Sequence, residues 1–189
     1  GADNTAVGKD ALVVNTTGAN LVAIGKGALT ANTTGATNTA VGLNALAANT
    51  TADNNTAIGY AALGANTTGT KNVAVGAYAL DAATTGNGNT CVGYWAGSVQ
   101  TTQNDNTLVG YYAGYPTTGY RNTVLGSYSG YELTSGHTNL LLGYHAGYST
   151  SPSGTIDTEN YRICLGDNDI TNAYIKVDWT VTSDRRDKT

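Results

Sequence analysis

The sequence predicts an all-β protein, a parallel β-solenoid (β-roll) of stacked 17-residue coils. Three observations support this prediction. A glycine recurs at a fixed interval, a short apolar run precedes it, and turn residues separate the copies. The intervals are 17 residues, except for one of 16 before Gly126 and one of 23 before Gly166. The closing glycines are Gly8, Gly25, Gly42, Gly59, Gly76, Gly93, Gly110, Gly126, Gly143 and a tenth, Gly166.

The composition fits stacked coils better than a packed globule. The 189 residues include no Phe and no Met, and only 12% are charged, about half the usual quarter. In a solenoid each coil buries a few small side chains against its neighbours, so no large central core is needed. The net charge is -4 and the one basic cluster is Arg185-Arg186, which argues against nucleic acid as a partner. No run of about 18 apolar residues predicts membrane insertion.

The two residues before each closing glycine form the predicted strand. The residue directly before the glycine is always a large aliphatic, such as Val41 or Ile58, and the residue before that is always apolar, such as Ala40 or Ala57. Neighbouring strand residues point to opposite faces, so both faces should be buried. One face can lie inside the coil. No helix is predicted to cover the other, so we expect another copy of the chain to cover it, which predicts a homo-oligomer.

Two positions exchange volume along the chain. Four residues after the glycine, the first five copies have leucine and the next four have glycine, as in Leu63 and Gly114. At the switch, the residue two before the closing glycine grows from alanine to Cys91, Leu108, Val124 and Leu141. Close packing forces such exchanges only between side chains in contact. We therefore expect the two positions to pack together on one buried face.

Turn residues divide the remainder of each coil. Asparagine recurs four residues before the glycine, with Leu21 as the exception, and predicts a column bonded amide to amide. Asn-Thr-Thr-Gly at 15–18, 32–35 and 66–69 predicts the other corner. Each coil is therefore expected to contain two short strands and two turns. Cys91 and Cys164 lie about four coils, or ~20 Å, apart, too far for a disulfide.

Three segments are predicted. Residues 1–154 form the repeat shaft, and residues 155–182 a terminal β capping or transition segment. The latter contains one more strand-glycine copy at 161–166 and an alternating strand at 173–179. Residues 183–189 differ in character from both.

The repeats resemble two known families. The N-T-A-V-G-x-x-A-L unit looks like the head repeats of trimeric autotransporter adhesins, which are trimers of left-handed parallel β-rolls. The form with N-T-T-G turns is similar to repeats of bacteriophage tail fibres, and the resemblance covers residues 1 to about 150. It implies a homotrimeric fibre protein of the virion, extracellular, with a structural and adhesive role at a host-cell receptor, either a glycan or a protein. A bacterial trimeric surface adhesin is the alternative.

The segment Ser183-Asp184-Arg185-Arg186-Asp187-Lys188 resembles the opening of the self-cleaving intramolecular chaperone domain of phage tail fibres and tailspikes. The resemblance implies cleavage just before Ser183 by a Ser183–Lys188 dyad, in which the amine takes the serine proton. The rest of that domain does not follow in this chain, so we expect no peptidase activity from it.

Aromatic residues gather in the second half at equivalent places one coil apart. They predict either a stacked ladder that stiffens the shaft and covers the space left by the glycines, or a sugar-binding surface. These candidates are Tyr94, Trp95, Tyr111, Tyr112, Tyr115, Tyr128, Tyr131, Tyr144 and Tyr148.

Other chemistries have weaker support. A polysaccharide-degrading enzyme would need a carboxylate pair from Asp157, Glu159, Asp167 and Asp169. Regular threonines suggest ice binding, but the paired threonines lie at turns rather than along a strand. His137 and His145 lack partners at metal-ligand spacing, so neither a metal nor a cofactor is expected.

Overall fold

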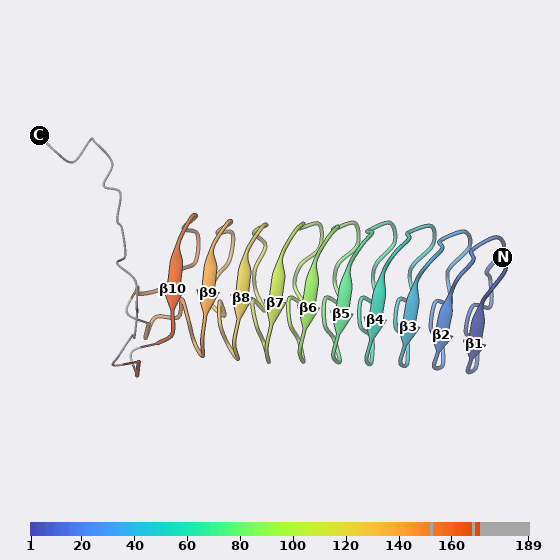
Figure 1. The fold of residues 1–189 in the computed structure, drawn as a ribbon, viewed down its shortest axis with the longest axis horizontal. Helices are drawn as coiled ribbons and strands as arrows, with labels where there is room; N and C mark the ends of the chain where they lie inside the picture. Colours follow the sequence, from blue (N-terminus) through green and yellow to red (C-terminus); the bar gives the residue numbers. More distant parts are fainter. Residues whose placement is uncertain (152, 168, 171–189) are drawn as a thin grey trace, which may run out of the picture.

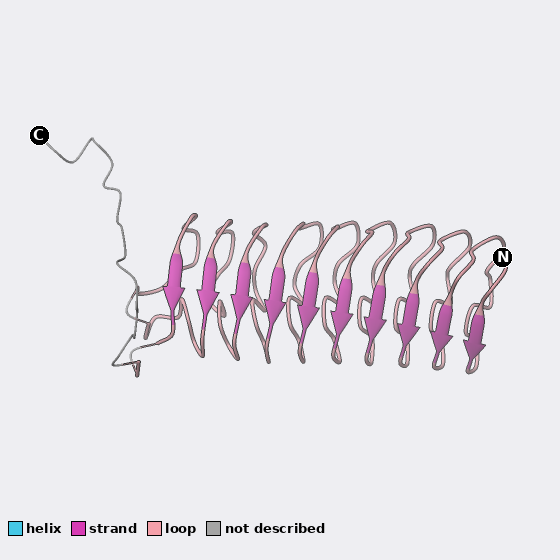
Figure 2. Cartoon of the chain, in the orientation of Figure 1, coloured by secondary structure: helices cyan, strands magenta, loops and turns pink. Residues whose placement is uncertain are grey.

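The chain forms a single row of stacked coils, with one strand in each (Figure 1). The computed structural model describes residues 1–151, 153–167, 169 and 170. Figure 2 shows strands joined by loops and turns, and no helix in the described part of the chain. The strands are β1 (Thr5–Val7), β2 (Val22–Ile24), β3 (Thr39–Val41), β4 (Thr56–Ile58), β5 (Val73–Val75), β6 (Thr90–Val92), β7 (Thr107–Val109), β8 (Thr123–Leu125), β9 (Leu140–Leu142) and β10 (Ile163–Leu165).

All ten strands pair in parallel in chain order, as one sheet. The register aligns equivalent residues of successive copies, so that Ala57 pairs with Ala40 on one side and Ala74 on the other. The predicted parallel solenoid of 17-residue coils is confirmed. The 16-residue interval falls in a shortened turn at 117–119, and the 23-residue interval adds a loop before β10 without disturbing its pairing with β9.

The expectation of two strands per coil was wrong, because each coil has one. After the closing glycine the backbone enters the left-handed region twice, for example at Ala61 (φ 52°) and Leu63 (φ 51°). Residues in this region cannot continue an extended strand. The second half of the coil is therefore a chain of turns. Its backbone groups still bond from coil to coil, as in Leu63 N–H to the Ala79 carbonyl at 3.0 Å.

The closing glycine is required by its position. Gly42 has φ 140°, and a Cβ there would collide with the backbone carbonyl of Gly59 in the next coil. Only glycine combines this φ with so close an approach between backbones. The periodic glycine is thus the contact at which successive coils touch.

The interior follows the predicted volume exchange. We call the coils closed by Gly8 to Gly76 the first block and those closed by Gly93 to Gly143 the second block. In the first block a leucine reaches inward from the turn beside a strand alanine, and Leu63 and Ala57 are fully buried. In the second block the strand side chain takes that space. A Cβ on Gly114 would lie 2.9 Å from Leu108 Cδ2, so the two positions pack together as predicted.

The asparagines form two columns, and only one is bonded amide to amide. Four residues before the glycine, the side chains bond the backbone instead. Asn55 Oδ1 accepts from the Asn72 backbone N–H at 2.9 Å, and Asn55 Nδ2 donates to the Gly69 carbonyl at 2.8 Å. In this column Asn89 adds a bond to the Asn72 side chain at 3.1 Å. The predicted amide ladder lies at the Asn-Thr-Thr-Gly turn, where Nδ2 of Asn32, Asn49 and Asn66 each donates to Oδ1 of the preceding asparagine.

The single chain buries only the inward face of the sheet. The residue before each glycine points outward and is exposed or half-buried, at 56% for Val7, 40% for Ile58 and 49% for Leu125. The first strand residue shares this outer face and is most often threonine. The expected second cover is therefore not supplied by the described part of the chain.

Several expectations fall outside the described residues. The strand predicted at 173–179 and the Ser183–Lys188 pair belong to this part of the chain. Cys91 and Cys164 are buried and free, as predicted, and burial raises the pKa of the Cys91 thiol, which keeps it unreactive. In the described ranges no helix is long and apolar enough to span a membrane.

Candidate functional site: an aromatic ladder beside the strand ends

The aromatic side chains follow the closing glycines at the ends of the strands. Because the strands are parallel and in register, equivalent positions stack into columns along the solenoid. We call these columns together the aromatic ladder. Its three columns lie one, two and five residues after the closing glycine. The first column holds Tyr60, Tyr94, Tyr111 and Tyr144; the second holds Tyr78, Trp95, Tyr112, Tyr128 and His145; the third holds Tyr115, Tyr131 and Tyr148.

Rings of the second column stack on one another. The Trp95 and Tyr112 centroids are 6.1 Å apart with planes 7° apart, and those of Tyr112 and Tyr128 are 5.6 Å apart with planes 6° apart. The third column continues this packing, with Tyr115 and Tyr131 5.9 Å apart. These faces are directed at neighbouring rings, so their contribution to binding is limited to edges and hydroxyl groups. This packing supports the stiffening hypothesis for the inner columns.

The first column is the accessible one. Its four tyrosines are all exposed, from 41% for Tyr94 to 55% for Tyr144. Tyr94 and Tyr111 stack at 5.6 Å, while Tyr111 meets Tyr128 edge to face at 5.4 Å. An exposed column of rings with phenol hydroxyls suits a ligand with both apolar faces and hydroxyl groups.

The structure brings together all nine aromatic residues singled out from the sequence. Sequence reasoning missed Tyr60, Tyr78 and His145, which join the same network: Tyr60 contacts Tyr78 at 5.0 Å, and His145 contacts Tyr144 at 4.0 Å. Counting positions from each glycine would have found them. The expectation that rings cover the space left by the glycines was wrong. Tyr78 sits in a coil that retains Leu80, and strand side chains fill the space beside the glycines.

Two phenols of the second column are held in the protonated form. The pKa values of Tyr112 and Tyr128 are raised above the ordinary value of 10, mainly because the hydroxyl groups lose hydration, so these hydroxyls remain hydrogen-bond donors. Burial raises the pKa of Asp81, which lies beside Tyr78, to about 6. Among the described residues, Asp81 Oδ1, Trp95 Nε1 and Ser98 Oγ are buried without a hydrogen-bond partner. Unpaired polar atoms therefore gather at the end of the ladder near Tyr78 and Trp95.

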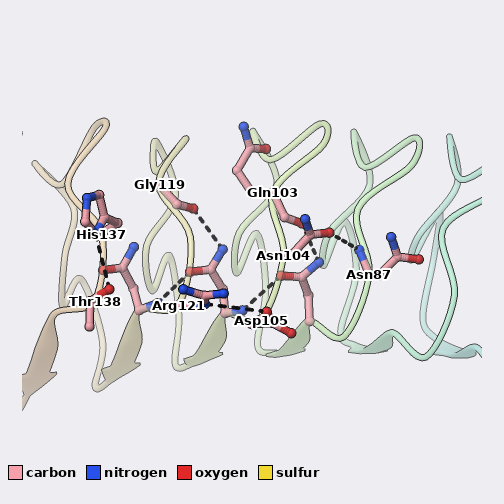
Figure 3. A network of polar contacts seen from close by, with 11 residues as sticks. Asn87, Gln103, Asn104, Asp105, Gly119, Arg121, His137 and Thr138 are labelled. Atoms are coloured by element: carbon pink, nitrogen blue, oxygen red, sulfur yellow. Dashed lines mark hydrogen bonds and ion pairs between the residues drawn. The ribbon is translucent and has the colours of Figure 1, made fainter.

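A second region lies at the opposite ends of the strands, where each strand begins (Figure 3). Asn87 N–H donates to Asn104 Oδ1 at 2.7 Å, and Asp105 lies 3.9 Å from Arg121. Tyr120 and His137 stack at 4.5 Å. A shallow groove of about 440 Å³ adjoins them, lined by Arg121, Thr123, Thr138, Asn139, Leu140, Tyr161, Arg162 and Ile163. Thr123, Leu140 and Ile163 belong to the outer strand face, so this groove is continuous with it.

The four acidic residues considered for catalysis do not converge. Glu159 lines a hollow of about 340 Å³ with Arg162, and its carboxylate accepts from the backbone N–H of Asp157 at 2.9 Å. Asp167 and Asp169 line another hollow with Tyr144 and His145. The four residues therefore form two separate pairs, one on each hollow. In the described ranges no three His, Cys, Asp or Glu residues could hold a metal ion.

Comparison of the chain with protein-family models, with curated proteins and with solved structures found no match.

Proposed function

We propose that the chain is an adhesive fibre segment of a phage tail, extracellular on the virion, which assembles as a homotrimer and presents a glycan-binding surface to the host. The observation that carries the proposal is the presence of two different rows of side chains on one solenoid. One is the uncovered row of aliphatic side chains on the outer strand face, and the other is the exposed first column of the ladder. The resemblance of the repeats to those of tail fibres and trimeric adhesins supports both the fibre role and the assembly of three chains.

The outer strand face supports self-assembly. Aliphatic side chains recur there at each coil, about 4.8 Å apart, and a contiguous apolar row on a soluble protein marks an interaction site. A second copy presents the same row at the same spacing, so equivalent side chains can interdigitate along the whole shaft. The row consists of Val7, Ile24, Val41, Ile58, Val75, Val92, Val109, Leu125, Leu142 and Leu165.

Assembly is tested by light scattering on the full chain. Wild type should have three times the chain mass of 19.3 kDa. Val75→Lys with Val92→Lys should yield a monomer with an unchanged circular dichroism spectrum, because the charges lie on the outer face. Thr85→Lys, at an exposed turn, is the matched control and should remain trimeric. A monomeric wild type would overturn the trimer.

Receptor binding is tested on an immobilised panel of neutral and acidic oligosaccharides. Tyr111→Ala with Tyr144→Ala should reduce binding at least about tenfold, since each removes an exposed ring of the first column. Tyr161→Ala, which removes an exposed tyrosine near the strand starts, should leave binding unchanged. Wild type that binds no glycan on the panel would contradict the glycan part and leave a protein receptor as the alternative.

Two other roles use the same surfaces. A bacterial trimeric surface adhesin shares the assembly, and the producing organism distinguishes the two. One observation favours ice binding: threonines lie in the strands as well as at the turns, and Thr39, Thr56 and Thr90 point outward in register. Thermal hysteresis from a monomer would favour that role over the fibre.

Autocleavage before Ser183 stays a proposal from resemblance, because Ser183 and Lys188 lie outside the described residues. The mass of the product of the complete gene tests it. A cut before Ser183 would support the fibre and its chaperone, while an intact junction would count against them. Release of reducing sugar from host polysaccharide would instead favour a degrading tailspike.

A further inference from the structure

The first column of the ladder is interrupted twice, and the two interruptions differ. Ala77 lies between Tyr60 and Tyr94, and Ser127 lies between Tyr111 and Tyr144. At each place one ring is missing from a column that is otherwise continuous from the fourth coil to the ninth.

The gap at Ala77 is bridged by the second column. The ring of Tyr78 contacts Tyr60 at 5.0 Å and Tyr94 at 6.3 Å, both edge to face. The aromatic network is therefore continuous past Ala77, with no break between the flanking rings.

The gap at Ser127 is closed only through two successive rings of the second column. Tyr128 contacts Tyr111 at 5.4 Å and His145 at 5.4 Å, but among the described aromatic contacts it has none with Tyr144. Tyr144 instead stacks on its own neighbour, His145, at 4.0 Å. Tyr111 and Tyr144 are also among the most exposed rings of the ladder, at 45% and 55%. The first column therefore has no ring between Tyr111 and Tyr144, and we call this position, occupied by Ser127, the slot.

The slot has the dimensions of one ring. Residues two coils apart in a column are separated by about 9.6 Å at their Cα atoms, so a ring midway lies about one coil spacing from each. This is the arrangement of Tyr94 and Tyr111, whose centroids are 5.6 Å apart. Ser127, at this position of the column, carries a hydroxyl, and the next residue, Tyr128, carries a phenol.

The charges nearby select the kind of ring. Among the described residues, the columns of the surrounding coils contain no lysine or arginine. The ionisable groups of this region are the acidic Glu132, Asp167 and Asp169, together with His145 and the phenols. An acidic sugar would therefore meet carboxylates here, and no lysine or arginine of the described columns. A neutral pyranose offers apolar C–H faces for the flanking rings and hydroxyl groups for Ser127 and Tyr128.

We propose that the slot between Tyr111 and Tyr144, above Ser127, is a subsite for one neutral pyranose ring, which takes the place of the missing ring in the first column. This inference rests on the proposed glycan binding and locates it. The bound sugar would extend the stacking of the first column, so the same column of rings both stiffens the shaft and binds the ligand.

The test places a tyrosine in each gap of the first column by substitution. Ser127→Tyr supplies the missing ring, and should reduce binding of neutral oligosaccharides on the immobilised panel at least about tenfold while the midpoint of thermal unfolding stays equal or rises. Ala77→Tyr is the matched control and should keep wild-type binding. Tyr144→Ala, which removes one wall, should also reduce binding and covers the case in which Ser127→Tyr does not fold.

The outcomes separate this inference from the proposed function. If wild type binds neutral glycans and Ser127→Tyr binds them equally well, the proposed subsite is wrong, while the proposed glycan binding is retained. If Ala77→Tyr weakens binding as much as Ser127→Tyr, the open gap is not the determinant and the slot is wrong. If wild type binds only sialylated or uronic oligosaccharides, the neutral subsite is overturned. If wild type binds none, the glycan function itself fails.

Discussion

The first and second blocks share one backbone but fill it from opposite directions. In the first block the turn supplies the large core side chain, as Leu63 does, and the strand supplies an alanine. In the second block the strand supplies it, as Leu108 does, and the turn supplies glycine. The left-handed backbone is kept in both, with φ 51° at Leu63 and 55° at Gly114. The interior therefore constrains the summed volume of the two positions and leaves open which of them supplies it.

The closing glycine provides the most severe test of a shared backbone. Gly42→Ala in the first block and Gly110→Ala in the second should each cost about 4 kcal/mol, since both place a Cβ against a backbone carbonyl at φ near 140°. Urea unfolding of both variants measures the free energies. A difference between them of more than about 1 kcal/mol would break the claim of one common backbone.

The volume exchange predicts a rescue. Gly114→Leu should destabilise the chain by about 3 kcal/mol by overpacking against Leu108. Adding Leu108→Ala recreates the pair of the first block and should recover about 2 kcal/mol. A double-mutant cycle by urea unfolding gives the coupling energy. A double variant less stable than Gly114→Leu alone would show that the blocks do not exchange volume at these positions.

The blocks also differ seven residues after the glycine. Asn49 makes a full set of buried bonds, to Asn32, Ala52 and Asn66, whereas both amide atoms of Gln100 are buried without a partner in the described structure. Asn49→Leu should cost about 2 kcal/mol, while Gln100→Leu should gain about 1 kcal/mol. Leu133 occupies the same position in the eighth coil, so leucine fits.

Calorimetry compares the two leucine variants directly. Equal destabilisation would mean that Gln100 is as well bonded as Asn49, through water held at that position. The contrast between the blocks at this corner would then disappear.

The smallest expected effect concerns Asp81, at the boundary between the blocks. Burial raises its pKa in the folded state from the ordinary value of 3.8 to about 6, so the folded state binds the proton more tightly. The resulting stability is fully present below pH 4 and is lost as the pH rises through about 6. Asp81→Asn should remove this dependence and stabilise the chain at pH 8 by about 1 kcal/mol, allowing for the carboxyl's partial exposure. Thermal unfolding at pH 4 and pH 8 measures it, and an unchanged pH dependence in the variant would contradict it.

Periodicity made the coil, the strand and the volume exchange predictable, because each leaves the same residue type at a fixed distance from a glycine. The single strand per coil was not predictable, since leucine gives no sign that it will adopt a left-handed φ, as Leu63 does. The asparagine columns were misassigned because hydrogen-bond partners depend on rotation of the amide. Tyr60 and Tyr78 were not predicted, because they lie outside the aromatic-rich second block and only their position in the repeat relates them to it.

The glycine contact also bears on how such a chain changes length. Because Gly42 meets Gly59 in the way that Gly59 meets Gly76, removing one whole period joins two surfaces that already fit. Recombination between repeated gene segments would do this in a single step. Insertion or loss of whole coils is therefore a route by which length could vary while every junction stays intact, whereas a shift by a fraction of a coil would misalign every column beyond it.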